Sequence, residues 1–165
     1  YFRMAHVLGI DKDTGARVCH GRWIFEAQDE EGLLPAGASV AAKEHLYLTD
    51  GRARVLMASG CGDGEALPAV CVNEFGKGKG IYLASFQVTP ENTRMLYQLI
   101  RYAGGEGTEG LYMTDNLYTE CAYYPESRRL VIINNSDREQ TASVPTQAGI
   151  QTVTMAPYDT VFAEL

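Results

Sequence analysis

Apolar residues at the start of the chain recur at the spacing of one helix face, and a long polar segment follows them. Phe2, Ala5 or His6, and the Val7–Leu8 pair share that face, and Gly9 directly after them is typical of a helix end. Residues 11–45 are mostly polar or turn-forming and keep no regular period. The pattern therefore predicts a short helix followed by a largely irregular excursion.

Two hairpins are predicted in the middle of the chain. The strand-like run HLYLTDGRARVLM is centred on Asp50–Gly51, a dipeptide whose two residues readily adopt the positive φ of a tight turn. The runs AVCVNEF and GIYLASF meet at GKGKG, residues 76–80, which predicts a second turn with glycines at positive φ and lysines directed to water. Both alternating sets of GIYLASF are largely apolar, so we expect a central strand covered on both faces.

An amphipathic helix is predicted after the second hairpin. Thr89 can accept a hydrogen bond from a free first-turn N–H, Pro90 suits the first helical position, and Gly104–Gly105 ends the pattern. Apolar residues recur at i, i+3, i+4 and i+7, and they should face a sheet: Leu96, Leu99, Ile100 and Ala103. A strand followed by such a helix is typical of an α/β layer.

The pattern changes near Gly107 to short strand-like runs separated by turn-forming residues. These runs are LYMTD, TECAYYP, RLVIINNS, QTASVP, IQTVTM and TVFAEL. The fold class we predict is therefore an α+β chain with two domains. Residues 1–107 form the end of an α/β domain, and residues 108–165 form a small antiparallel, β-sandwich-like domain.

Composition narrows the classes of partner. The chain has 165 residues, 45% of them hydrophobic, which is enough apolar material for a core. A formal net charge of -7 argues against binding to nucleic acid, because phosphate neutralisation needs clustered Lys and Arg. No apolar run approaches the roughly 20 residues of a membrane span, and no signal peptide pattern is present. We expect a cytoplasmic protein that has no membrane or nucleic-acid partner.

Phosphate binding is the first chemistry to weigh. GKGKG, residues 76–80, lacks the Ser or Thr of a phosphate-binding loop and precedes a strand instead of a helix, which favours the hairpin. The first turn of the predicted helix after Thr89 is a second place where phosphate could physically bind. Nothing in the residues themselves calls for a phosphate at either place.

The cysteines and histidines form no recognisable catalytic or metal-binding motif. Cys19 and His20 are adjacent in an extended segment and so point in opposite directions, which excludes a nucleophile–base pair between them. Cys61, Cys71 and Cys121 form no CxxC pair, and the last two lie in apolar runs, where cysteine is a small core residue. His6, His20 and His45 lack metal-ligand spacing. The sequence assigns no catalytic residue, no cofactor and no metal.

Two further clusters have both a structural and a functional interpretation. The acidic run Gln28–Gly32 could be imagined as the paired carboxylates of glycoside chemistry, but consecutive acids in a turn-rich segment usually face solvent. Tyrosines are frequent in the last unit and could form a platform for stacking sugars, although packing between strands is the favoured interpretation. They are Tyr112, Tyr118, Tyr123, Tyr124 and Tyr158.

The order of segments resembles the carboxyl-terminal part of one enzyme family. YFRMAHVLGIDKDTG, VNEFGKGKGIYLASFQVTPENTRMLYQLIRYA, YMTDNLYTECAYYPESRRLVIINNSD and the tail PYDTVFAEL resemble, in this order, the 1,3-β-galactosyl-N-acetylhexosamine phosphorylases. These enzymes are also called lacto-N-biose phosphorylases, glycoside hydrolase family 112. The GKGKGIYL turn and the following helix are also similar to the amidotransferase-like domain of some β-galactosidases.

The resemblance implies a catalytic (β/α)₈ barrel upstream, an amidotransferase-like middle domain ending near residue 107, and a C-terminal β domain. Family members cleave galactosyl-β-1,3-N-acetylhexosamine with phosphate and inversion, giving α-galactose 1-phosphate and the amino sugar. No segment here corresponds to the barrel, so no catalytic residue is carried over. The chain is expected to be a non-catalytic scaffold for that barrel, with a homodimer as a further expectation.

Two other functions stay open at this stage. The last unit alone could be a carbohydrate-binding accessory module that uses its tyrosines. An independent amidotransferase-like enzyme would need a reactive cysteine of lowered pKa on a sharp strand-to-helix turn and a later His-x-Glu, and neither pattern is written here.

Overall fold

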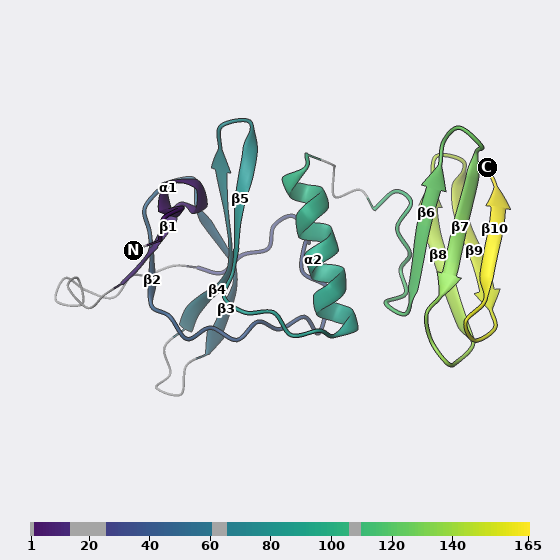
Figure 1. The fold of residues 1–165 in the computed structure, drawn as a ribbon, viewed down its shortest axis with the longest axis horizontal. Helices are drawn as coiled ribbons and strands as arrows, with labels where there is room; N and C mark the ends of the chain where they lie inside the picture. Colours follow the sequence, from purple (N-terminus) through teal and green to yellow (C-terminus); the bar gives the residue numbers. More distant parts are fainter. Residues whose placement is uncertain (1, 14–25, 61–65, 106–109) are drawn as a thin grey trace. The chain divides into compact units, whose positions relative to one another are not determined.

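A computed structural model describes four stretches of the chain: residues 2–13, 26–60, 66–105 and 110–165. The chain divides into two compact units, Tyr1–Thr108 (unit 1) and Glu109–Leu165 (unit 2), which are described separately below. Within the described stretches every named strand pairs in the antiparallel sense, and the fold is rich in β-structure with two helices (Figure 1).

The main sheet of unit 1 has three strands in the order β3 (Arg54–Gly60), β4 (Ala66–Phe75) and β5 (Gly78–Leu83). The central strand β4 is buried from Leu67 to Asn73, as its continuous apolar sequence requires. One face of the sheet packs on the helix α2 (Pro90–Ala103). The resulting core contains Leu33, Val40, Leu56, Ala69, Val70, Val72, Met95 and Leu99.

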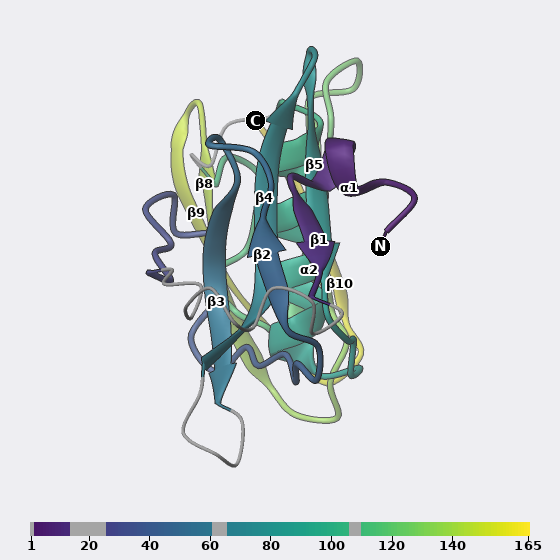
Figure 2. The same cartoon turned by 90° about the vertical axis from the view of Figure 1, so that its left-hand side faces the viewer.

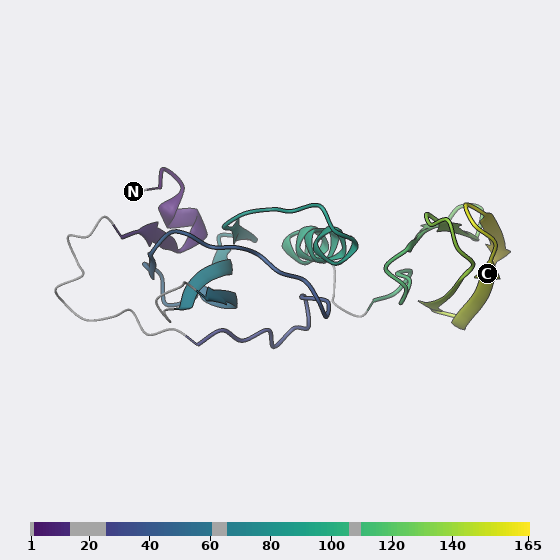
Figure 3. The ribbon, with the colours of Figure 1, turned by 90° about the horizontal axis from the view of Figure 1, so that it is seen from below.

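The opposite face of that sheet is covered by the beginning of the chain. The helix α1 (Ala5–Leu8) leads into β1 (Ile10–Lys12), which pairs with β2 (Leu46–Leu48). Their apolar side chains meet the sheet in a second cluster of Ile10, Leu46, Val55 and Cys71. Figure 2 shows β1 and β2 in front of the sheet and α2 behind it, and Figure 3 shows α2 end-on.

The hairpin predicted at Asp50–Gly51 is wrong. The chain does turn there, because the Ala53 N–H donates to the Asp50 carbonyl at 3.1 Å. However, β2 pairs with β1, whereas β3 pairs with β4, so the two flanking strands belong to different sheets. With the partners found instead, each strand adds an apolar side chain to a core cluster, since Leu46 of β2 packs with Ile10 and Leu56 of β3 packs with Val70.

The GKGKG segment is the tight hairpin turn that its sequence predicts, with two corrections. Phe75 pairs with Gly78, and Gly76 has a φ of 61°, but Gly78 and Gly80 have no positive φ. Gly80 is needed for another reason, since a Cβ there would collide with the backbone of Val7 at the end of α1. Lys79 is half-buried instead of directed to water.

The strand β5 lies at one edge of the three-stranded sheet, so its predicted central position is wrong within the described residues. The apolar pattern was read correctly as two covered faces, because Ile81 and Leu83 pack against the α2 core and Tyr82 against the β1–β2 cluster. Coverage of two faces does not require a neighbour on both edges. An apolar pattern on both faces of a strand therefore does not show that the strand is central in its sheet.

The predicted helix after Thr89 is confirmed as α2. The Thr89 hydroxyl accepts the Asn92 N–H at 3.1 Å, and Pro90 occupies the first turn. Its buried face differs from the predicted one, because Asn92, Met95 and Leu99 are buried, whereas Ile100 is 61% exposed. Met95 and Asn92 turn the helix so that Ile100 lies outside the core.

Unit 2 consists of five strands in two sheets. One sheet has the order β10-β7-β6, formed by β6 (Thr119–Tyr124), β7 (Arg129–Asn134) and β10 (Thr160–Glu164). The other pairs β8 (Gln140–Thr146) with β9 (Gly149–Met155). Alternate residues of both sheets point inward to one core: Leu130, Ile132, Ala142, Val144 and Met155. The predicted antiparallel runs are strands, except that residues 111–115 form turns.

Candidate functional site

Two sequence-predicted candidates in the described part of unit 1, His6 and His45, have separate surroundings. His6 is exposed and packs edge-on against Phe75 with ring centroids 5.6 Å apart. The His45 carbonyl accepts the Asp13 N–H at 2.8 Å beside β2. Cys19, His20 and Cys61 lie outside the described residues. No group of three or more His, Cys, Asp and Glu side chains in the described stretches is arranged to hold a metal ion.

The two described cysteines are core residues, as their apolar surroundings predict. Burial raises the pKa of the Cys71 thiol to about 12, which is the reverse of what a nucleophile needs. The Cys121 thiol donates to the Tyr112 carbonyl at 2.7 Å. Both thiols are therefore held in structural positions.

The acidic run Gln28–Gly32 does not simply face solvent, which corrects the expectation. The Asp29 carboxylate accepts the N–H groups of Leu33 and Leu34 at 2.9 and 2.8 Å and so fixes the turn that enters the core. Glu31 is half-buried, and only Glu30 among the three acids is exposed. The Asp29 and Glu31 carboxylates are thus engaged in contacts within unit 1.

Glu31 belongs to a charged cluster that the sequence did not predict. Arg54 on β3 approaches the Glu31 carboxylate at 2.6 Å and donates to the Tyr102 hydroxyl at 3.0 Å. The Tyr102 hydroxyl donates to Glu31 at 3.2 Å, and the Lys79 ammonium lies 4.6 Å from the centre of the Tyr102 ring. The cluster joins the irregular segment, two strands and α2.

The electrostatics of this cluster are those of a structural ion pair. Burial favours the neutral acid of Glu31, but the hydrogen bond and charge of Arg54 outweigh it and lower the pKa of Glu31 below 4.5. Burial and the Glu31 charge raise the pKa of Tyr102, so this phenol stays neutral. At neutral pH Glu31 is therefore ionised beside Arg54 and Tyr102 keeps its proton, an arrangement that suits a scaffold better than acid–base chemistry.

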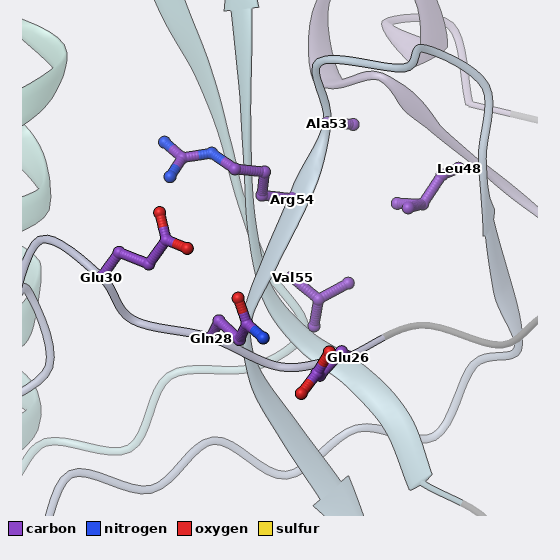
Figure 4. A pocket seen from close by; sticks show the side chains of 7 residues that line it. All are labelled: Glu26, Gln28, Glu30, Leu48, Ala53, Arg54 and Val55. Carbon is purple, nitrogen blue, oxygen red and sulfur yellow. The ribbon is translucent and has the colours of Figure 1, made fainter.

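A pocket of about 160 Å³ opens beside this cluster, between residues 26–30 and β3 (Figure 4). The Gln28 N–H donates to the Val55 carbonyl at 2.9 Å, which lays the segment along the strand. Glu26, Gln28 and Glu30 contribute polar groups, while the remaining described lining is Arg54 and the apolar Leu48, Ala53 and Val55. The described lining offers hydrogen bonds but no Ser, Cys or His nucleophile.

The amino end of α2 is used internally. Besides the Thr89 cap, the Asn92 amide donates to the Gln87 carbonyl at 2.9 Å and accepts the Ser39 N–H at 2.9 Å. Glu91 adds a negative charge in the first turn. The cap at Thr89 and the negative charge of Glu91 both disfavour a phosphate at this helix end.

The tyrosines of unit 2 fall into three places instead of one platform. Tyr112 and Tyr123 stack in the core, with ring centroids 4.1 Å apart and an interplanar angle of 6°. Tyr124 is exposed at the end of β6 that pairs with Arg129. Tyr118 and Tyr158 are exposed at the opposite end, 50% and 70% respectively.

Asn134 organises the end of unit 2 where Tyr118 and Tyr158 lie. This buried side chain donates to the carbonyls of Arg138 and Ala156 at 2.7 and 2.8 Å, and accepts the N–H and hydroxyl of Ser136. A single carboxamide thus joins the loop after β7 to the turn before β10. The loop is held in one shape from inside.

No helix in the described stretches is long and apolar enough to cross a membrane.

Two family models match the chain in order. A model described as the lacto-N-biose phosphorylase central domain matches residues 1–108, and one described as the lacto-N-biose phosphorylase C-terminal domain matches residues 112–163.

Curated relatives carry related names. A D-galactosyl-β-1→4-L-rhamnose phosphorylase of Lachnoclostridium phytofermentans is 43% identical over 164 residues, which is 99% of this chain and 22% of the relative. A 1,3-β-galactosyl-N-acetylhexosamine phosphorylase of the same organism is 29% identical over 153 residues, 87% of this chain and 20% of the relative. The chain therefore spans about a fifth of the length of these relatives.

A solved structure shares the fold. The β-galactosidase from Rahnella sp. R3 superposes with a TM-score of 0.54 at 20% identity, covering 96% of this chain and 24% of that one. At this identity the likeness concerns the fold alone.

Proposed function

The chain belongs to the lacto-N-biose phosphorylase family, and from this premise we propose that it is a non-catalytic, C-terminal portion of a galactoside phosphorylase. The observation that carries the proposal is the match of the central and C-terminal domain models to residues 1–108 and 112–163. In support, the charged groups of Glu31, Arg54 and Asp29 are occupied in joining segments of unit 1. Unit 1 would be the end of an amidotransferase-like domain.

The reaction proposed for the whole enzyme is phosphorolysis of a β-galactosyl disaccharide. Phosphate attacks the anomeric carbon, the glycosidic bond breaks, and a proton goes to the leaving oxygen, so that galactose 1-phosphate and a free acceptor sugar form. The acid and the phosphate-binding groups would lie in the barrel of the same polypeptide. The residues of this chain would position that barrel.

Two acceptor sugars are candidates. Identity of 43% over 164 residues to a galactosyl-rhamnose phosphorylase favours L-rhamnose. The description of the family models and the relative at 29% identity favour N-acetylhexosamine, which is the acceptor implied by the resemblance of the sequence. The 43% match covers more of the chain at higher identity, so we place L-rhamnose first.

The proposed partners are the catalytic barrel of the same polypeptide and a second copy of the protein. The outer edge of β5 supports the latter, because the strand is covered on both faces but pairs with β4 alone in the described stretches. Light scattering of the whole protein and of a Tyr82→Pro variant tests this. A dimer that persists unchanged in the folded variant would contradict a β5 contact.

The experiment that tests the function compares the 165-residue chain with the whole protein that contains it. Each is supplied with phosphate and either galactosyl-β-1,4-L-rhamnose or galactosyl-β-1,3-N-acetylglucosamine, and galactose 1-phosphate is measured. We expect release by the whole protein, faster with the rhamnoside, and none by the chain. Phosphorolysis by the chain alone would overturn the non-catalytic role, and none by the whole protein would overturn the reaction.

A further inference from the structure

The turn before β10 holds an exposed tyrosine in a conformation that favours glycine. The Asp159 N–H donates to the Ala156 carbonyl at 3.2 Å, which closes a β-turn with Pro157 at its second position and Tyr158 at its third. Tyr158 has a φ of 57°, and a positive φ at this position is normally adopted by glycine or asparagine. The Tyr158 residue is nevertheless 70% exposed.

Packing within unit 2 does not account for this tyrosine. Tyr112 has nearly the same backbone angle, 58°, but its ring stacks on Tyr123 in the core and so contributes to folding. Tyr158 makes no comparable ring contact with the described residues. A strained backbone that carries an exposed ring points to a role in binding something outside the chain.

A second exposed tyrosine lies across the same loop. The Tyr158 N–H donates to the Ser136 carbonyl at 3.1 Å, and the Asn135 N–H donates to the Tyr118 carbonyl at 2.9 Å. Tyr118 and Tyr158 therefore flank Asn135–Ser136 on both sides. The buried Asn134 side chain makes hydrogen bonds to Ser136, Arg138 and Ala156. These bonds fix the backbone of the loop that lies between the two tyrosines.

We propose that Tyr118 and Tyr158, with the loop between them, form a binding site for neutral pyranose sugars of an oligosaccharide. Tyrosine rings offer flat faces to the C–H face of a sugar and keep a hydroxyl in water. Exposed planar polar side chains in the loop, Asn135, Asp137 and Arg138, supply hydrogen bonds to sugar hydroxyls. With the exposed Glu139 the loop carries two negative charges and one positive charge, a surface that disfavours an anionic ligand and is compatible with a neutral one.

The composition of this surface favours sugar over a protein partner. A protein interface is centred on a contiguous apolar patch, whereas here the two aromatic residues alternate with amide, carboxylate and guanidinium groups. The site is a feature of unit 2 and stands independently of the proposed phosphorolysis, because it uses no residue of the barrel.

The test titrates the 165-residue chain with galactose, L-rhamnose, N-acetylglucosamine and a β-1,4-galactan oligosaccharide at millimolar concentration, followed by calorimetry and by amide NMR shifts. The decisive variant is Tyr158→Gly, which removes the ring and leaves a backbone that glycine adopts without steric cost. Tyr158→Asn keeps a side chain that tolerates the same angle. Tyr118→Ala tests the second ring, and Tyr124→Ala is the matched control at the opposite end of unit 2.

We expect saturable binding of at least the oligosaccharide, with shifts at Ser136 and Asn135. Each of the three variants at Tyr118 and Tyr158 should weaken it about tenfold, whereas Tyr124→Ala should leave it unchanged. Binding of no sugar would overturn the proposal, as would sugar binding that survives in the variants or is lost equally in Tyr124→Ala. Phosphorolysis by the whole protein is measured separately, so its failure cannot be confused with these results.

Discussion

The two units of this chain differ in how far along the sequence their polar contacts reach. Unit 1 fastens segments that are far apart in sequence: Tyr102 bonds to Glu31 over 71 residues, and the Asn73 amide bonds to the Val7 carbonyl over 66. Unit 2 is built mainly from successive hairpins, such as β6–β7 and β8–β9. Its polar network around Asn134 joins neighbouring loops. The comparison teaches that polar side chains close a fold in unit 1 and shape a surface in unit 2.

The largest test of this comparison removes a core side chain from unit 1. Leu99 lies on the face of α2 that packs on β4, and the residue is 1% exposed. Leu99→Ala should therefore lower the free energy of unfolding of unit 1 by about 3 kcal/mol. Hydrogen exchange, measured amide by amide, reports each unit separately. Ile100→Ala on the same helix is the control and should change little. An equal loss of protection in unit 2 would merge the two units into one cooperative block and break the comparison.

Asn134→Ala is the corresponding test in unit 2. Loss of the buried carboxamide leaves the Ala156 carbonyl and the Ser136 groups without this partner, and should cost unit 2 about 2 kcal/mol. Urea unfolding and the exchange of the Ser136 amide measure the effect. The exposed neighbour Asn135→Ala should be nearly silent. If Asn134→Ala and Asn135→Ala lower the free energy of unfolding equally, the hydrogen bonds of Asn134 do not hold this end of unit 2 together.

The charged cluster of unit 1 should show itself in the pH dependence. Arg54→Met removes the partner that lowers the pKa of Glu31 and should cost about 1 kcal/mol at neutral pH, since the pair is partly exposed. A lowered native pKa contributes stability above the unfolded value near 4.5 that is lost as the pH falls through the native pKa. The difference between Arg54→Met and the parent should therefore shrink below about pH 4.5.

The control for Arg54→Met is Arg52→Met, which removes the exposed partner of Asp50. That carboxylate has a pKa of about 2, set chiefly by its hydrogen bonds with Arg52, but the Arg52 side chain is largely exposed to solvent and Asp50 is only partly buried. Urea unfolding between pH 3 and pH 7 should detect a smaller change for this control. A larger loss of stability for Arg52→Met than for Arg54→Met would contradict the idea that the Glu31–Arg54 cluster stabilises unit 1 more than a surface ion pair does.

The smallest effect is expected at Tyr158. Tyr158→Gly relieves a positive φ that costs a non-glycine residue about 1 kcal/mol. Glycine also makes the unfolded chain more flexible, which offsets part of this gain. Unit 2 should gain about 0.5 kcal/mol in thermal unfolding. The same change at Tyr112, which has a similar φ but stacks on Tyr123, should destabilise unit 2. A clear loss of stability at Tyr158 would show that its ring is part of the fold.

Sequence patterns predicted the elements better than their partners. The cap at Thr89, the turn at Gly76 and the antiparallel runs of unit 2 other than residues 111–115 were confirmed, because each depends on residues close together in the chain. The Asp50–Gly51 hairpin and the central position of β5 were wrong, because pairing depends on which distant strand offers the better apolar surface. The family resemblance was confirmed by both domain models.

The candidate sites followed the same division. Five tyrosines were recognised in the sequence as either packing or platform, and the structure separates the stacked pair Tyr112–Tyr123 from the exposed pair Tyr118 and Tyr158. The ion pair of Glu31 with Arg54 carried no signal in the sequence. Glu31 was noted only as part of the acidic run Gln28–Gly32, and Arg54 lies in no motif. Their contact exists because the irregular segment runs beside β3 and α2.

The sequence by itself determined the family, the capped helix, the tight glycine turn and the alternating strands, since these follow from local backbone preferences and short apolar periods. Only the tertiary structure decided which strands pair, which helix face is buried and which tyrosines remain exposed. Those outcomes depend on the best total burial among segments dozens of residues apart. Gly80 illustrates the difference: its place in a turn was readable, but the reason it has no side chain is the backbone of Val7 packed against it.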